Sequence, residues 1–189
     1  MMKYLFTALT VLFCDFAYSQ TNFGFTDATI VYKRGDSMLC LIKREVNYGD
    51  VITYKIHQDA DESQVGSSYI KSIRIASKYI ENITLDKKEK LATLILNGKL
   101  TLFNYVETQK GEAVKIPNSN GGMYAPIKVT VHYIIKSGDI FTEIKEKSFE
   151  KDLKNLLSDC PAIITSIENH AYTFIDIPAI IEQYNLCKN

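Results

Sequence analysis

The chain of 189 residues has no tryptophan, only four prolines and no excess of charge of either sign. Its 22 basic residues balance 22 acidic ones, which argues against nucleic-acid or anionic-membrane binding, because both need a basic surplus. The lack of tryptophan weighs against a sugar-stacking cleft. The sequence also has no phosphate-binding glycine loop, no HExxH and no GxSxG, so no motif indicates a cofactor or a catalytic site.

What is present, 46% hydrophobic and 23% charged residues, is the composition of an ordinary globular domain. The patterning divides the chain into a signal peptide at 1–19 and a single α+β domain at 20–189. We expect this domain to have a β-rich body over about residues 28–145 and a helical C-terminal subdomain over residues 147–188.

The N-terminus has the three parts of a secretory signal peptide. Lys3 supplies the positive charge, residues 4–13 are mostly apolar, and Ala17-Tyr18-Ser19 forms a cleavage site. This apolar stretch is much shorter than the roughly 20 residues of a membrane-spanning helix, and no later segment is apolar enough to span. Lipoprotein processing at Cys14 is the alternative, although a bulky residue precedes it. We therefore expect an exported protein, either periplasmic or associated with the cell surface or outer membrane.

In an exported protein the cysteines can form disulfides, because disulfides persist outside the cytosol. Cys160 and Cys187 stand 27 positions apart around two predicted helices, and we expect them to form a disulfide. Such a bridge contributes about 3 to 4 kcal/mol on the chain-entropy model. Cys40 lies in an apolar strand pattern and is interpreted as a small buried hydrophobic residue. No CxxC spacing indicates redox chemistry or zinc.

Hydrophobic alternation predicts strands from residue 28 to about residue 145. The expected strands are 28–34, 37–43, 51–57, 69–75, 78–85, 91–96, 99–106, 127–136 and 140–144. Asn97-Gly98 predicts a two-residue type I′ turn, since both residues tolerate positive φ. The last hairpin is expected to turn an apolar row inward, and this row consists of Ile127, Val129, Val131, Tyr133 and Ile135.

Beyond residue 145 the apolar period becomes helical. Ser148 is expected to cap a first helix, Pro161 to begin a second, and Asp176 to cap a third. About nine strands followed by three short helices predict an α+β fold. Its core would be an antiparallel sheet or a partly closed barrel, with the helices on one face or across one end.

Two long loops are the candidate binding regions, because binding residues concentrate on loops held by a rigid sheet. The first, 58–68, begins beside the densest set of metal-ligating residue types, which are His57, Asp59, Asp61 and Glu62. These are weak metal candidates, because Gln64 and Ile70 stand where a calcium loop needs glycine and glutamate. A solvated turn is therefore favoured over a metal site.

The second long loop, 108–126, is rich in asparagine and glycine. Its candidate binding residues are Asn118, Asn120, Met123 and Tyr124. No catalytic residue is predicted. The nearest base to Cys160 in the sequence is His170, at the far end of a predicted helix, and a disulfide would remove the nucleophile. Asn82-Ile83-Thr84 matches the N-glycosylation sequon but also fits an ordinary strand.

Four short motifs give the chain a resemblance to a known family. These are the strand pair around Gly35-Asp36-Ser37, Asn97-Gly98-Lys99-Leu100, Leu157-Ser158-Asp159-Cys160-Pro161 and Tyr184-Asn185-Leu186-Cys187. Together they resemble a family of exported proteins of Bacteroidota-type bacteria that has no established activity. Ser37 and Cys40 depart from the family pattern. The resemblance implies an exported chain with a β-rich body and a helical C-terminal segment.

These observations favour a non-enzymatic interaction module of the bacterial cell envelope over an enzyme. Its partner would be another protein, a glycan or an envelope component, bound at a sheet edge or a long loop. The alternative is a carrier of a small apolar ligand, since about eight strands can close around one such cavity. An envelope hydrolase is the third possibility, because residues distant in sequence can converge on folding.

Overall fold

The computed structural model describes residues 24–43, 49–111, 114–115, 123–124 and 127–187. The predicted signal peptide, 1–19, lies outside them. Ten strands form one open antiparallel sheet in the order β12-β11-β8-β7-β6-β5-β1-β2-β3-β4. Three helices follow, so the predicted α+β fold is confirmed, as a sheet that does not close into a barrel.

The strands of the large sheet agree closely with the predicted ones. Their bounds are β1 (Phe25–Tyr32), β2 (Ser37–Lys43), β3 (Val51–Lys55), β4 (Ser63–Gly66), β5 (Ile70–Ile75), β6 (Lys78–Leu85), β7 (Lys88–Leu96), β8 (Thr101–Lys110), β11 (Ile127–Ser137) and β12 (Ile140–Ile144). β4 was not predicted and lies inside the expected loop 58–68. Its sequence, SQVG, is short and mostly polar, so it carries no strand pattern of its own.

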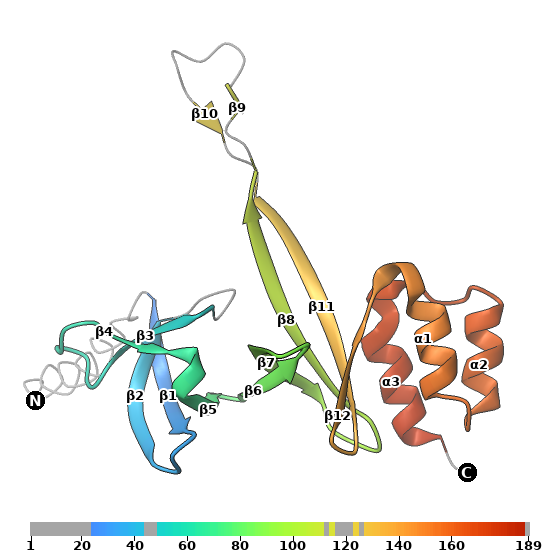
Figure 1. The fold of residues 1–189 in the computed structure, drawn as a ribbon, viewed down its shortest axis with the longest axis horizontal. Coiled ribbons are helices and arrows are strands. Elements are labelled where there is room, and N and C mark those ends of the chain that lie inside the picture. The colour runs from blue at the N-terminus through green and yellow to red at the C-terminus, as the bar shows by residue number, and fades with distance from the viewer. Residues whose placement is uncertain (1–23, 44–48, 112–113, 116–122, 125–126, 188–189) are drawn as a thin grey trace, which may run out of the picture.

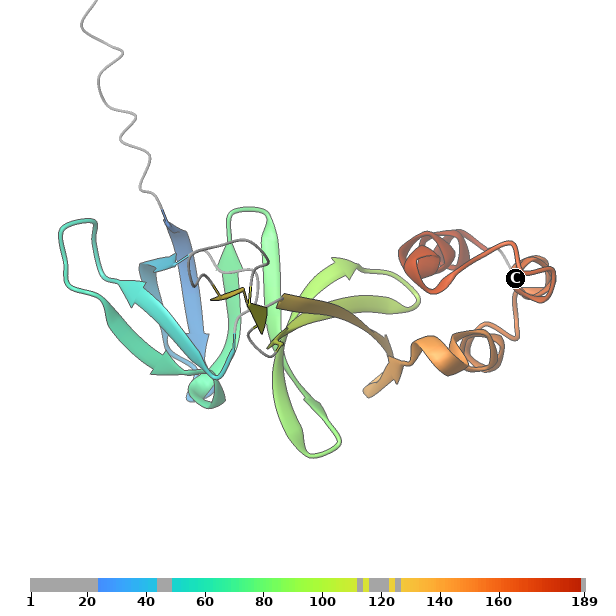
Figure 2. The ribbon, with the colours of Figure 1, turned by 90° about the horizontal axis from the view of Figure 1, so that it is seen from above.

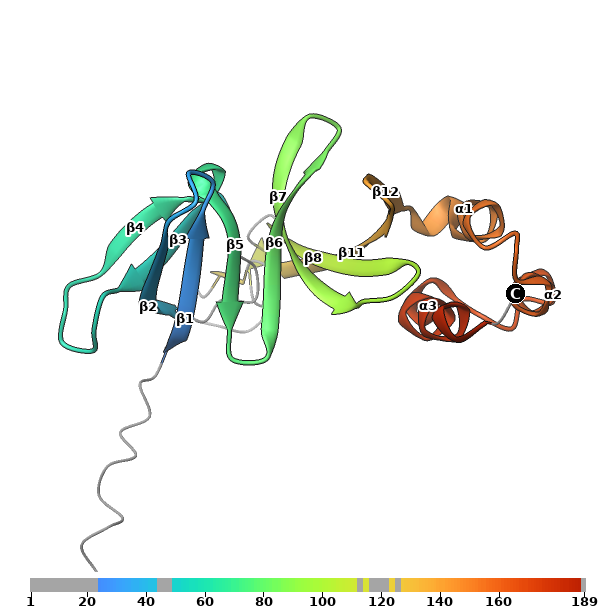
Figure 3. The ribbon, with the colours of Figure 1, turned by 90° about the horizontal axis from the view of Figure 1, so that it is seen from below.

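The elements lie in three regions along the longest axis (Figure 1). Strands β1–β5 are at one end, β6–β8 with β11 and β12 are in the middle, and the helices are at the other end. The hairpin of β8 and β11 projects away from the body, with β9 (Val114–Lys115) paired to β10 (Met123–Tyr124) at its tip. The views from above and below (Figures 2 and 3) show the helices well separated from β1–β5.

Buried apolar side chains form three clusters that follow this division. One lies within β1–β7 and includes Ile30, Ile42 and Ile73. A second joins the helices to β8, β11 and β12 and includes Leu102, Ile135 and Leu153. A small third cluster lies between them and consists of Ile83, Ala92, Phe103 and Ile134. Cys40 belongs to the first cluster, as its apolar surroundings predicted.

The predicted type I′ turn at Asn97-Gly98 is wrong. Leu96 pairs with Leu102, so five residues separate the paired positions, and Gly98 does not have a positive φ. The two-residue turn with two positive φ values lies one hairpin earlier, where Leu85 pairs with Lys88 across Asp86 (φ 46°) and Lys87 (φ 66°). Contacts from α3, described below, determine the conformation around Gly98 instead.

All three predicted helix starts are confirmed in position. The helix α1 (Phe149–Leu156) follows Ser148, α2 (Pro161–Glu168) begins at its proline, and α3 (Ile177–Leu186) follows Asp176. Each helix turns apolar residues toward the cluster that it shares with the sheet. The buried ones are Leu153, Ile163, Ile167, Ile177, Ile180, Ile181 and Tyr184, joined by Leu157 directly after α1. Among the described residues, no helix is long and apolar enough to cross a membrane.

The two expected cap side chains bond differently from the prediction. Ser148 donates its hydroxyl to the Asp152 carboxylate at 2.7 Å and makes no bond to the helix backbone. Asp176 turns backward and accepts from both the N–H and the hydroxyl of Thr173, each at 2.7 Å. It therefore closes a capping box on the preceding 3-10 turn, Phe174–Asp176, which leads directly into α3.

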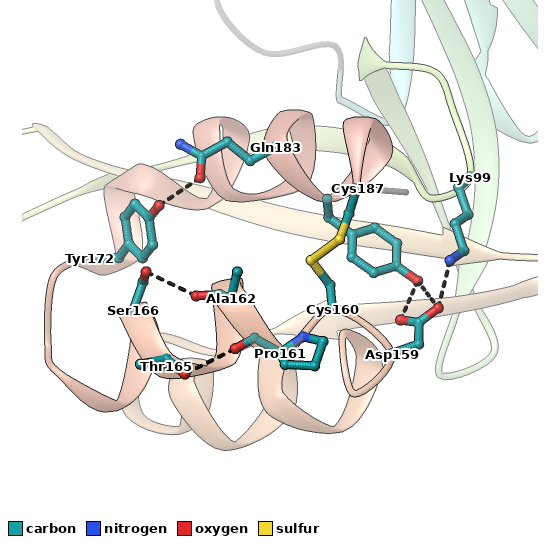
Figure 4. Close-up of a disulfide and its surroundings, with 11 residues drawn as sticks. Lys99, Asp159, Cys160, Pro161, Ala162, Thr165, Ser166, Tyr172, Gln183 and Cys187 are labelled. Carbon is teal, nitrogen blue, oxygen red and sulfur yellow. Dashed lines mark hydrogen bonds and ion pairs between the residues drawn. A yellow bond between two sulfur atoms is a disulfide. The ribbon is translucent and has the colours of Figure 1, made fainter. Parts of the chain in front are cut away.

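The predicted disulfide between Cys160 and Cys187 is present, with the two Cα atoms 6.4 Å apart. It ties the start of α2 to the end of α3 and so encloses both helices (Figure 4). A buried structural disulfide is typical of proteins that fold outside the reducing cytosol. Because both sulfurs are bonded to each other, Cys160 has no free thiol for catalysis.

Candidate functional site

The four weak metal candidates do not form a metal site. His57 and Asp59 lie in the turn after β3, closed by a hydrogen bond from the Ala60 N–H to the His57 carbonyl at 3.1 Å. All four are exposed, and Glu62 forms an ion pair with Lys43 across 3.7 Å. Within the described ranges, no group of three or more histidine, cysteine, aspartate or glutamate side chains could hold a metal ion. The solvated turn favoured by the sequence is the better description.

The second candidate loop lies mostly outside the described residues. Asn118 and Asn120 fall there. Met123 and Tyr124 form β10 and pair with Lys115 and Val114 at the tip of the long hairpin. The hairpin itself, which places this tip away from the body, is the more informative feature (Figure 1).

We define the arm as residues 105–110 of β8 together with residues 127–132 of β11. These segments pair with each other from Ile127 opposite Lys110 to His132 opposite Tyr105. β12 covers the outer edge of β11 only from Tyr133 onward. In the described chain, no strand pairs with the outer edge of either arm segment. The arm is thus a two-stranded ribbon with both edges open.

One face of the arm carries an exposed apolar row. Ile127, Val129 and Val131 alternate along β11 and are 61%, 55% and 37% exposed. They were predicted to point inward as part of an unbroken buried row, and this prediction is wrong for them. The row does continue into the core through Tyr133 and Ile135, because the helices cover this face only near the base of the hairpin. The outer half of the same row has no cover among the described residues.

The opposite face of the arm carries a polar cluster at its base. The ring of His132 stacks on Tyr105, with centroids 4.4 Å apart and planes 4° from parallel. Its Nδ1 lies 2.7 Å from Oε1 of Glu143, within hydrogen-bond distance. Glu107 receives a hydrogen bond from Lys90 at 2.9 Å, which links β8 to β7. The cluster therefore joins two neighbouring strands, β7 and β12, to the base of the arm.

Charge and burial shift the pKa values of two members of this cluster. The hydrogen bond from Lys90 lowers the pKa of Glu107, so its carboxylate remains ionised at neutral pH. Burial, followed by the nearby Glu143 and Glu107 charges, raises the pKa of Tyr105 to about 12. Tyr105 therefore stays a neutral phenol. The ionised Glu107 keeps its ion pair with Lys90, and the neutral Tyr105 adds no further negative charge to the cluster.

His132 has one hydrogen-bonding contact in this cluster. In the described part of the chain, the only hydrogen bond of the His132 ring is with Glu143, and its buried Nε2 has no partner. The nearest charged oxygen, Oε2 of Glu107, lies 3.7 Å from that nitrogen. Among the described residues, no serine, threonine or cysteine side chain is hydrogen-bonded to His132. We interpret the cluster as the support that fixes the arm to the body from one side.

A polar hollow of 240 Å³ lies beside the cluster, where β7 and β8 diverge. Their pairing stops at Thr93 opposite Asn104, so the segments 89–91 and 105–109 line the hollow from opposite sides. The Lys90–Glu107 ion pair crosses the gap between these strands. An ion pair therefore spans this hollow, which is polar and is not an apolar ligand pocket.

Two further hollows lie in the β1–β5 region. One of 750 Å³ is bounded by Leu39, Cys40 and His57 among others, and one of 430 Å³ by Tyr32, Val65 and Tyr69 among others. Burial raises the pKa of the Cys40 thiol to about 11, so it is an unreactive thiol at neutral pH. Asp27, Cys40 and His57 all line the larger hollow, but no hydrogen bond joins their side chains in the described chain.

Three of the short motifs noted in the sequence meet at one place, which we call the junction (Figure 4). Lys99 contacts Asp159 at 2.5 Å, and the Tyr184 hydroxyl donates to Asp159 at 2.8 Å. The Asn185 side chain binds both the N–H and the carbonyl of Leu100, each at 2.9 Å. The disulfide lies directly beside these contacts. The junction fastens the helices to the loop between β7 and β8, so these motifs have a structural role.

No protein-family model matches the chain, and neither a curated protein nor a solved structure matches it. Its functional interpretation therefore depends on the site itself. The arm and its polar cluster are the features that sequence reasoning missed. Glu107 and His132 share one face of the β8–β11 pair, but the sequence did not predict that pairing, and Lys90 and Glu143 come from other strands.

Proposed function

We propose that the protein is an exported interaction module of the bacterial cell envelope that binds an extended segment of a protein chain along the arm. One observation carries this proposal: the open edge of β11 runs beside the exposed row of Ile127, Val129 and Val131. An open edge offers unpaired backbone N–H and carbonyl groups, and a neighbouring apolar row adds side-chain contacts. Together they suit the addition of a strand.

The other edges of the sheet are less suited to this role. β4 has four residues and a mostly polar sequence, and β12 has five and carries Glu143. Short or charged edge strands are the usual protection against pairing with other chains. The open edge of β8 faces the polar hollow that Lys90 and Glu107 bridge. The open edge of β11, residues 127–132, is as long as that of β8, residues 105–110, and is the more apolar of the two.

The other candidate functions gain less support. A carrier needs an enclosed apolar cavity, and the open sheet offers none of the barrel type. A hydrolase needs convergent titratable groups with an activated nucleophile, and no described serine, threonine or cysteine is hydrogen-bonded to His132 in the polar cluster. Export is inferred from the N-terminal sequence, and the disulfide agrees with it. The resemblance to exported Bacteroidota-type proteins supports the same compartment.

Photo-crosslinking in the cells that produce the protein tests this proposal. A photoreactive amino acid at Val129 is expected to give an adduct of one defined mass. The matched control places it at Leu39, which is 78% exposed and lies away from the arm on β2, where β1 pairs with one edge and β3 pairs with the other only from Leu41 onward. The change Val131→Lys should abolish the adduct from position 129. No adduct, or the same adducts from both positions, would contradict binding at the arm.

A further inference from the structure

We propose that the segment added to β11 is the β11 strand of a second copy of this chain, which rests on the proposed function of the arm. The two copies would be related by a two-fold axis at Val129. Such an interface is isologous, since the same residues face each other from both sides. The chain carries no net charge, so no long-range repulsion opposes the approach of two copies.

The pleat and the extent of the open edge determine the register. β12 occupies the edge from Tyr133 onward, which leaves residues 127–132 for a partner. Directly opposed residues of an antiparallel pair lie on the same face of the sheet. If the two-fold axis passes through Val129, the rows of Ile127, Val129 and Val131 from both copies lie on the same face of the combined sheet. A register shifted by one residue would put the two rows on opposite faces. In the centred register, Ile127 of each copy faces Val131 of the other.

Charges are complementary in this register. Lys128 of each copy faces Thr130 of the other, so no like charges are directly opposed. Thr130 in turn pairs with Glu107 on its own β8. Lys128 therefore stands in the same cross-strand row as Glu107 of the other copy, two strands away, or about 9.6 Å at the usual spacing. A lysine can reach toward a glutamate across the short threonine side chain between them.

The combined sheet would bring the apolar rows of the two copies side by side on one face. Its order would be β8-β11 of one copy followed by β11-β8 of the other. Each β11 would contribute Ile127, Val129 and Val131 to a shared apolar face, flanked by the half-buried Val106 that lies opposite Val131 on β8. This arrangement pairs the open edge and gives each apolar row cross-strand contacts with the other.

Sedimentation velocity of the full chain purified after export, over a series of concentrations, tests the second copy as the partner. The wild-type protein is expected to form a concentration-dependent dimer. Val129→Lys would oppose two like charges at the axis, and we expect dimerisation to weaken roughly tenfold or more. Val129 is 55% exposed, so this variant should keep the circular dichroism and melting temperature of the wild type. Leu39→Lys is the matched control and should dimerise normally.

A charge exchange tests the register itself. Thr130→Lys would face Lys128 of the other copy and should weaken the dimer. Adding Lys128→Glu to the same chain should restore it, because the new charges then attract across the interface. A monomer at every concentration, or a dimer that is unaffected by Val129→Lys, would overturn the second copy as partner. Either result leaves arm binding intact if position 129 crosslinks to a different protein, whereas the absence of every adduct would overturn both.

Discussion

Two asparagine side chains take the place of backbone partners in this fold. Asn185 binds both backbone groups of Leu100, as a neighbouring strand would. Asn82 donates its Nδ2 to the carbonyls of Ser67 and Ile70, each at 2.9 Å. Because that nitrogen is engaged and half-buried, the sequon at Asn82 is explained as a strand residue with a bonding role. Such bonds satisfy backbone groups where the regular ladder is interrupted.

Asp159 makes the junction sensitive to acid. Hydrogen bonds from Lys99 and then Tyr184 lower the pKa of its carboxyl in the folded protein. A lowered folded pKa contributes stability that is fully present above the ordinary aspartate pKa of about 3.9 and is lost as the pH falls through the folded value.

We therefore expect Asp159→Asn to reduce the free energy of unfolding at neutral pH and to flatten its dependence on pH in the acid range. Urea unfolding of both proteins from neutral pH to below pH 4 measures this. If the free energy of unfolding depended on pH in the same way in both proteins, the hydrogen bonds to Asp159 would not stabilise the fold.

Lys87 occupies a backbone conformation that its side chain disfavours. It has a φ of 66° in the two-residue turn between β6 and β7. Lys87→Gly should raise the free energy of unfolding by about 0.5 to 1 kcal/mol, because glycine adopts this region without the Cβ strain. Chemical denaturation provides the measurement. Lys88→Gly, one residue later in the strand, serves as the control and should destabilise the protein.

At the scale of elements, α3 fixes the shape of the loop between β7 and β8. A Cβ added at Gly98 would lie 2.5 Å from Cγ and Nδ2 of Asn185. Asn185 would have to move and lose both bonds to Leu100, so we expect Gly98→Ala to cost about 1 to 3 kcal/mol of stability. Gly49→Ala, where a Cβ meets nothing within 4 Å, should be nearly neutral.

A double-mutant cycle identifies the cause of the loss. In a chain that already carries Asn185→Ala, the clash is absent, so Gly98→Ala should cost much less than it does in the wild type. Equal costs in the two backgrounds would mean that Gly98 is needed for its own backbone conformation. The unfolding free energies of the four proteins decide between these causes.

Most elements were predictable because their signals are local. The strands 37–43, 78–85 and 140–144 match the alternation of apolar residues to the residue, and the proline at 161 begins its helix as expected. The turn at Asn97-Gly98 was not predictable from local preference, because Asn185 occupies the space beside it from 85 or more positions away. Long-range contacts overrode the local turn signal there.

At the scale of the whole molecule, the arm shows where periodicity stops being informative. The alternation in β11 correctly places its apolar residues on one face, but it does not say how far along the strand a core extends. The helices bury Ile135 and partly bury Tyr133, but they do not cover Val131, which is exposed. The polar cluster could not be predicted from the sequence either, because His132, Lys90 and Glu143 come from three strands that only the folded sheet brings together.

The disulfide also determines how the molecule would carry a mechanical load. A pull between the C-terminus and the β-rich body passes from Cys187 across the sulfurs to Cys160, so α2 and α3 lie outside the path of tension. Single-molecule stretching should show these helices contributing no length while the bond is intact. After reduction, the 27-residue separation becomes extensible and should add up to roughly 85 Å, at about 3.4 Å per residue less the original gap. The oxidised protein would thus behave as a short, stiff tether.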